Sequence, residues 1–352
     1  MNKSRNWVII FIGLVFICLG ILTSINYIID PLWTFSHSNK YNSKQSDFNE
    51  RQQKTNLVYF QGFEKYDGIL LGSSRSTFIN QNHFTDMNIF NFALNSIYPY
   101  EYEKYIDFVK RIKKKNLKYI IIGADFYNTA IPKNIKFEKP EFYIRNTTKP
   151  FYRYKMLLSK DTLKYSKRNY KNTKIDNKIY YDRNNIKYQK KVSENERRLR
   201  YKISLNHHLE ELDSRNYIYN ENYKTILEKI KDKNKNTKFI IFTSPISSNL
   251  LASIIQKSKR LKEYKRWLKE LVNVFGEVNH FMTINEITTD LNNYPDDDHY
   301  YPYIGKILAN KITNKDLKTP ENFGIILNKN NIDNYLKTFE EKILKYKINE
   351  KL

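Results

Sequence analysis

The sequence predicts an α/β fold of three layers, in which a mostly parallel sheet is flanked by helices and preceded by one N-terminal transmembrane helix. Two observations predict the layers: apolar runs of strand length recur along the chain, and amphipathic helical patterns lie between them. Such alternation is typical of parallel sheets, because each helix returns the chain to the edge where the next strand starts. A third observation, the charge-free segment 7–29, predicts the membrane helix.

This N-terminal segment has the features of a signal anchor. As a helix, residues 7–29 span roughly 34 Å, which is enough to cross a hydrocarbon core. Lys3 and Arg5 precede the segment, whereas no Lys or Arg occurs in the ten residues after it. The positive-inside rule therefore places residues 1–6 in the cytoplasm and the rest of the chain outside. A cleaved signal peptide is the alternative, because the strictly apolar centre, residues 8–22, is short.

The strands of the predicted sheet are continuous apolar runs, which suit strands buried on both faces. We expect them at 68–71, 89–94, 117–123 and 238–243, with a weaker fifth at 279–284. Helical stripes predict helices at 100–115, 221–233, 259–275 and 300–312, and a strand leading into a final helix at 323–344.

The domain organisation follows from the segments that break this alternation. Residues 30–46 are polar and are expected to be a linker, and residues 47–352 are expected to form a single domain. Within it, residues 137–220 are rich in Lys, Arg, Asn and Tyr, with no strand-like run. They predict a basic, helical or partly disordered insertion over one end of the sheet. Either a solvated elaboration or a lid that binds a polymer fits this composition.

The chain carries 61 Lys and Arg against 37 Asp and Glu, a formal net charge of +24. Such a balance suggests nucleic acid, but the excess is spread along a chain that is also rich in Asn, Ile and Tyr and poor in Gly and Pro. This pattern indicates the codon bias of an AT-rich genome, and export also argues against nucleic acid. Anionic phospholipid or glycan is the expected partner class. The single cysteine, Cys18, excludes a disulfide within the chain.

Two segments carry candidate chemistry. Gly72-Ser73-Ser74-Arg75-Ser76 directly follows the first predicted strand, and the functional crevice of an open parallel sheet lies at the carboxyl ends of its strands. The segment is either an ordinary turn or the display of a serine nucleophile. A second segment contains Asp296-x-x-His299 before a helix. A serine needs a general base, and the base imidazole needs a carboxylate to orient it.

The aspartate run around Asp296 has two other interpretations. It could cap the helix that follows, or its three carboxylates could bind a cation. The other histidines are expected to be structural or surface residues, with His207 and His208 on a solvated helix face and His280 structural. The chain contains no H-E-x-x-H motif and no cysteine cluster, so catalytic zinc is not expected.

Taken together and in this order, the two segments resemble the SGNH (GDSL-like) hydrolase superfamily, in its membrane-anchored branch linked to acyl modification of bacterial cell-surface polymers. Gly72-Ser73-Ser74 matches the Gly-Asp-Ser block of that family, with Ser73 in place of Asp. Asp296 and His299 match its Asp-x-x-His block. The resemblance implies a flavodoxin-like sheet and a triad of Ser74 as nucleophile, His299 as base and Asp296 as orienting acid.

The middle blocks of the family depart from its pattern here. The family places an oxyanion-hole glycine after the second strand and an asparagine after the third. This chain has Asn95 or Ser96 at the first place and Asp125 at or near the second. A carboxylate donates to an oxyanion only when it is protonated. The resemblance therefore leaves Ser74, Asn95, Ser96 and Asp125 as candidates for the oxyanion hole or substrate contacts.

The implied function is an extracytoplasmic serine esterase or O-acyltransferase, for O-acetyl groups, that acts on cell-surface glycan without a cofactor or metal. The implied location is the bacterial cell membrane, with a single pass and the C-terminal domain outside. The implied partners are the membrane, a polysaccharide or acyl donor, and a multi-pass membrane O-acyltransferase. The alternative is a non-catalytic anchored module that binds glycan or assists such an acyltransferase.

Overall fold

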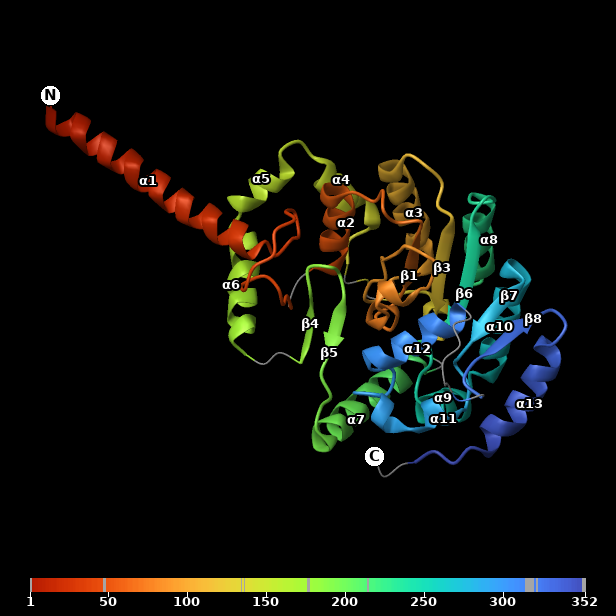
Figure 1. Cartoon of the computed structure of the whole chain (residues 1–352). Helices are drawn as coiled ribbons and strands as arrows, with labels where there is room; N and C mark the ends of the chain where they lie inside the picture. The colour runs from red at the N-terminus through yellow and green to blue at the C-terminus, as the bar shows by residue number, and fades with distance from the viewer. Residues whose placement is uncertain are drawn as a thin grey trace. The chain divides into compact units, whose positions relative to one another are not determined.

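The computed structural model (Figure 1) divides the chain into two compact units, Met1–Phe63 with Glu138–Asn185 (unit 1) and Glu64–Phe137 with Ile186–Leu352 (unit 2). It describes residues 2–349 except 47, 48, 134, 136, 176, 177, 214, 314–319 and 321.

Unit 2 is built on a six-stranded sheet in the order β2-β1-β3-β6-β7-β8. Its strands are β1 Gly68–Gly72, β2 Ile89–Asn91, β3 Tyr119–Ala124, β6 Lys238–Thr243, β7 Glu277–His280 and β8 Ile325–Asn328. The first five run parallel, and β8 is antiparallel to β7. The predicted α/β class with a mostly parallel sheet is confirmed. The expected weak strand at 279–284 begins two residues earlier and ends at His280.

Helices cover both faces of this sheet. All five residues of β1 are buried, which requires cover on each side. The longer helices of unit 2 are α3 Pro99–Lys113, α7 Glu194–Glu211, α8 Tyr223–Asp232, α9 Ser248–Gln256, α10 Leu261–Phe275, α12 Pro302–Ile312 and α13 Ile332–Lys345. Shorter elements are β5 Lys187–Gln189, α11 Glu286–Thr289 and the 3₁₀ turns Ser76–Phe78, Gln81–His83, Phe126–Thr129 and Leu291–Asn293.

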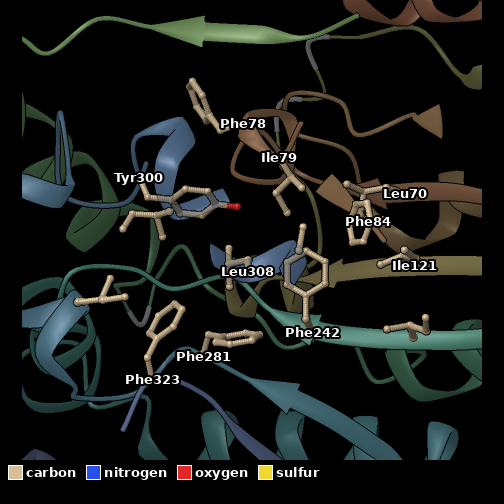
Figure 2. Packing of buried hydrophobic residues seen from close by; sticks show 14 of the residues in the cluster. Leu70, Phe78, Ile79, Phe84, Ile121, Phe242, Phe281, Tyr300, Leu308 and Phe323 are labelled. Atoms are coloured by element: carbon tan, nitrogen blue, oxygen red, sulfur yellow. The ribbon is translucent and has the colours of Figure 1, made fainter. Parts of the chain in front are cut away.

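One face of the sheet packs against α12. Figure 2 shows Leu70, Ile121 and Phe242 of three neighbouring strands gathered with Leu308 of α12. At Gly305 a Cβ atom would lie 2.6 Å from the carbonyl oxygen of Phe78. The glycine therefore lets α12 approach the turn that follows β1, and this approach positions the loop that precedes α12.

Unit 1 contains α1 Asn2–Ile29, α2 Glu50–Gln61, α4 Pro140–Thr148, α5 Tyr152–Leu157, α6 Lys160–Lys174 and the short strand β4 Ile179–Tyr181. Helix α1, drawn in red in Figure 1, packs against α5 and α6. It is long and apolar enough to span a membrane, with mean hydropathy 2.9 over its most apolar window.

The segment predicted as a linker, 30–46, belongs to the folded part of unit 1. The Trp33 side chain is fully buried, and its indole N–H donates to Gln45 Oε1 at 2.6 Å. Asp30 forms a buried ion pair with Arg183 at 2.6 Å. The predicted insertion, 137–220, is likewise divided, because residues 138–185 lie in unit 1 and residues from 186 onward lie in unit 2. The boundaries of the units thus differ from the predicted ones.

Candidate active site

Ser74 lies in the turn between β1 and the 3₁₀ turn at Ser76–Phe78. Gly72 and Gly123 are neighbours in the register of β1 and β3, and a Cβ atom on either glycine would overlap the Ser76 side chain. The two glycines therefore let Ser76 pack between the strand ends. The chain turns sharply there, with the Ser76 N–H donating to the Ser73 carbonyl at 3.0 Å. This turn leaves Ser74 half-buried at the carboxyl edge of the sheet.

His299 lies in the loop before α12 and faces Ser74. The distance from Ser74 Oγ to His299 Nε2 is 2.8 Å. On the other side of the ring, Nδ1 lies 3.0 Å from Asp296 Oδ2. With Nδ1 facing a carboxylate, the neutral form of the ring carries its proton on Nδ1, which leaves Nε2 free to accept the Ser74 hydroxyl, whereas the protonated ring donates from Nε2. The structure thus brings together the three side chains that the sequence predicted as a triad.

A second carboxylate, Asp298, also reaches the imidazole. Its Oδ1 atom lies 2.8 Å from His299 Nδ1, and its Oδ2 accepts a hydrogen bond from Arg75 at 2.7 Å. Asp296 differs in its other contacts, because Oδ1 accepts the backbone N–H groups of Asp298 and His299 at 3.1 and 2.7 Å. Asp296 therefore holds the loop as well as the ring, whereas Asp298 joins the ring to Arg75.

The aspartate run does not cap α12. The N-cap of this helix is Tyr301, which forms no side-chain cap bond, and Pro302 occupies a first-turn position. The interpretation of the run as an N-cap cluster is therefore wrong. The groups His208/Asp297/Asp298 and Asp296/Asp298/His299 bring possible metal ligands together, but Arg75 already bonds to Asp298 there.

Asp125 is fully buried and serves as a partner of the turn that carries Ser74. It accepts the hydroxyl of Ser73, and its Oδ1 lies 3.2 Å from Arg75 Nη1. Among the described contacts, this carboxylate points to Ser73 and Arg75 rather than to Ser74. Ser76 does not cap the 3₁₀ turn at Ser76–Phe78, because that turn has Arg75 at its N-cap and no side-chain cap bond.

Asn95 and Ser96 lie in the exposed loop after β2, which neighbours β1 in the sheet. The Leu94 N–H donates to the Gly72 carbonyl at 2.9 Å, so this loop starts at the edge that carries Ser74. Ser96 has a left-handed backbone, with φ 49°, and its side chain forms a hydrogen bond with Tyr127. Burial raises the pKa of Tyr127. A role for Asn95 or Ser96 in an oxyanion hole stays a prediction.

His208 is a site residue that the sequence interpretation missed. It was expected on a solvated helix face, but its side chain is 15% exposed, and Nδ1 lies 2.8 Å from Asp297 Oδ2. Its Nε2 lies 3.6 Å from Asp298 Oδ2. The sequence feature that could have located His208 is its spacing from Arg197 and Tyr201, which puts all three on one stripe of α7. Arg197 and Tyr201 are buried. His207, at 65% exposure, is solvated as expected.

Ionisable groups determine the electrostatics of the site. Burial acts to lower the pKa of His299, but Asp298 and then Asp296 offset this effect and raise it to about 10. Burial likewise opposes the charge of Asp298, yet His299, Arg75 and His208 hold its pKa well below the usual range. The pKa of His208 is raised by Asp298 and Asp297 despite its burial. The resting site therefore favours a protonated His299.

The Phe78 ring, next to the His299 imidazole, contacts Lys187 of the predicted insertion. The Phe78 ring lies edge-on to the His299 ring with centroids 5.9 Å apart. Lys187 of β5 places Nζ 4.2 Å from the centroid of Phe78 and donates to Thr77 Oγ1 at 2.9 Å. The insertion thus contributes a cation to the surroundings of Ser74.

His280 is structural, as expected. The hydroxyl of Thr243 accepts the N–H groups of Phe281 and Met282, so its proton is free to donate to His280 Nδ1 at 2.9 Å. Nε2 then carries the ring proton and faces Tyr264 Oη at 3.3 Å. Burial lowers the pKa of His280 to about 3. The ring is neutral and its two nitrogens are used internally.

No family model matches the chain, and no curated protein or solved structure matches it.

Proposed function

We propose that this protein is an extracytoplasmic, membrane-anchored serine esterase or O-acyltransferase of SGNH type that acts on cell-surface glycan. The observation that carries the proposal is the continuous contact chain from Ser74 Oγ through both nitrogens of His299 to Asp296 and Asp298. Nucleophile, base and orienting acid within hydrogen-bond distance are the arrangement that serine acyl transfer needs.

The reaction follows from these positions. Neutral His299 accepts the Ser74 proton at Nε2 while Oγ attacks the acyl carbonyl, and the carboxylates at Nδ1 stabilise the imidazolium that forms. The leaving alcohol takes the proton from Nε2, and an acyl-Ser74 ester remains. Water or a sugar hydroxyl then gives its proton to His299 and attacks this ester, which releases Ser74. Water makes the protein an esterase, and a sugar hydroxyl makes it an O-acyltransferase.

The oxyanion must be stabilised without Asp125, whose carboxylate contacts Ser73 and Arg75. The Ser74 N–H is the first donor in our proposal, because none of the hydrogen bonds of the described residues uses it. A backbone N–H in the loop of Asn95 and Ser96 is the second. Two such donors stabilise a tetrahedral intermediate by several kcal/mol in serine enzymes, about 3 to 4 kcal/mol for a single donor.

The location in the proposal is supported by α1 and its flanks. Lys3 and Arg5 precede the apolar helix, so the positive-inside rule favours a location outside the cytoplasm for the residues that follow α1. A reporter fused after Leu352 should be active outside the cytoplasm, and the protein should stay in membranes after a carbonate wash. A cytoplasmic reporter contradicts both the location and the glycan substrate.

A serine-directed fluorophosphonate probe tests the nucleophile on the full chain in detergent or nanodiscs. Ser74→Ala should abolish labelling and hydrolysis of small acetyl esters, a loss on the order of 10⁴ to 10⁶ in turnover, with little change in melting temperature. Ser76→Ala is the matched control from the same turn and should remain labelled. His299→Ala should match Ser74→Ala in turnover. Labelling of Ser74→Ala at the wild-type rate would favour the alternative, a non-catalytic glycan-binding or acyltransferase-partner module.

A further inference from the structure

Helix α5 and its flanking residues carry an apolar face that the fold of unit 1 leaves uncovered. Phe151, Tyr154 and Leu158 are 72%, 57% and 51% exposed. Tyr154 and Leu158 are four residues apart, which places them on one side of the helix. Phe151 is the N-cap of α5, and its carbonyl accepts the N–H of Tyr154 at 3.0 Å. Three large apolar side chains exposed together on so short a segment indicate a binding surface.

The opposite side of α5 is anchored in unit 1. Tyr152 is 7% exposed and stacks on Phe60 with ring centroids 6.3 Å apart. The guanidinium of Arg153 lies 4.3 Å from the ring centroid of Phe35. The uncovered face is therefore presented by a fixed helix, and not by a loop that could fold its apolar side chains inward.

The position of this face relative to α1 is set by Asn26. The Asn26 amide donates to the carbonyls of Leu157 and Ser159 at 2.8 and 3.3 Å, and Ser166 donates to Asn26 at 2.9 Å. Leu158 lies between the two bonded carbonyls. Its backbone is therefore fixed at the level of Asn26 along α1.

That level coincides with the end of the hydrocarbon core. The nineteen steps from Trp7 to Asn26 correspond to about 28 Å of helix, close to the ~30 Å of the core. The apolar residues of α1 before this point are largely bare, for example Phe16 at 70% exposure, whereas Asn26 is buried against α5 and α6. Leu158 and the face it belongs to are thus held where the acyl chains meet the headgroups.

We propose that the face formed by Phe151, Tyr154 and Leu158 inserts into the outer surface of the lipid bilayer. Aromatic residues are enriched at this depth because their rings suit the boundary between headgroups and acyl chains. Exposed Lys149 and Lys155 flank the face and complement anionic headgroups. The contact fixes unit 1 on the membrane surface in addition to the α1 anchor, and it is independent of the chemistry at Ser74.

Site-directed spin labelling of the full chain in nanodiscs that contain phosphatidylglycerol tests this contact. In a Cys18→Ser background, single cysteines are placed by Phe151→Cys, Tyr154→Cys and Leu158→Cys, and collision rates with oxygen and with a water-soluble nickel chelate are compared. The matched control is Leu199→Cys, an exposed leucine of unit 2 at 60% exposure. A label on native Cys18 reports the hydrocarbon core.

Insertion predicts a ratio of oxygen to nickel collisions several-fold higher at the three α5 positions than at position 199, approaching the ratio at Cys18. Nickel collisions at Leu158→Cys as frequent as at Leu199→Cys would overturn the proposal, because the face would then be in water. Low collision rates with both reagents would also overturn it, since that pattern indicates cover by protein, either a second copy or another chain. A water-exposed label at Cys18 would remove the anchor on which the proposal depends.

Discussion

Replacing Asp298 with asparagine tests how the two carboxylates at Nδ1 control the protonation of His299. In the wild type the pKa of His299 is about 10, against about 6.5 for an ordinary histidine, and this difference corresponds to about 5 kcal/mol of preference for the imidazolium. Only the neutral ring can accept the Ser74 proton. At pH 7 about one molecule in a thousand would have a neutral His299 ring. The rate of fluorophosphonate labelling should therefore rise about tenfold per pH unit up to about pH 9.

Asp298→Asn removes the carboxylate that contributes most to the raised pKa of His299. One opposite charge within hydrogen-bond distance raises the pKa of a basic group by about 1 to 3 pH units. The midpoint of the labelling profile should therefore move down by that amount. The limiting rate at high pH should fall at the same time, because the imidazolium formed in the transition state loses a partner.

The assay is the rate of labelling on the full chain between pH 6 and 10, with the melting temperature of each variant recorded. Asp297→Asn is the matched control, because Asp297 contacts His208 at 2.8 Å and not His299. Its midpoint should stay near that of the wild type. A wild-type midpoint near 6.5, or a midpoint that moves with Asp297→Asn but not with Asp298→Asn, would refute the electrostatic reasoning.

Three further predictions concern the buried polar groups of unit 2. Arg75→Met leaves the buried carboxylate of Asp125 without its cationic partner and removes one partner from Asp298, and it should cost about 3 to 5 kcal/mol of stability, measured by urea unfolding at pH 7. Asp125→Asn in the same chain should restore part of that loss, and its failure to do so would show that packing is responsible. Asp125→Asn alone should keep most activity, because the amide oxygen still accepts the Ser73 hydroxyl; a turnover far below that of wild type in a folded variant would assign Asp125 a direct role. The pKa of His280 is lowered to about 3, so as the pH drops the unfolded chain binds the proton before the folded chain does. Stability should therefore fall below pH 6.5, by about 2 kcal/mol at pH 5. His280→Gln should remove this pH dependence, and an unchanged dependence would contradict the assignment to His280.

The sheet of unit 2 could be predicted because its strands are continuous apolar runs, which need cover on both faces. The order of the segments then located Ser74 and His299 at one edge, and their contact at 2.8 Å agrees with that expectation. Helix α9, Ser248–Gln256, was not predicted, although it lies inside the core. Eight of its nine residues are buried, so it lacks the polar face that makes a helical stripe visible in sequence.

The interior of unit 1 beyond α1 could not be predicted, because polar side chains form much of it. In α2 the residues from Arg51 to Val58 are all buried, and most of them are polar. Their burial is compensated by hydrogen bonds to distant segments, such as Gln52 to Thr147 at 2.7 Å and Asn56 to the Leu32 carbonyl at 2.8 Å. Hydropathy patterns report burial only where it is apolar, so they describe these segments as solvated.

The charged groups that surround the triad were missed for a different reason: each of them is paired with charged groups from other segments of the chain. Arg75 and His208 approach Asp298 from the turn after β1 and from α7, segments far apart in the sequence. Each cation interacts with the carboxylate that contacts His299, and so reduces how strongly Asp298 stabilises the imidazolium. A lone Asp298 would favour the protonated ring still more and suppress the base. Arg75 and His208 thus keep a second orienting acid, Asp298, beside His299 while reducing its effect on the pKa of His299 in the resting site. The Asp296-x-x-His299 motif identifies only one of the carboxylates that take part in this balance.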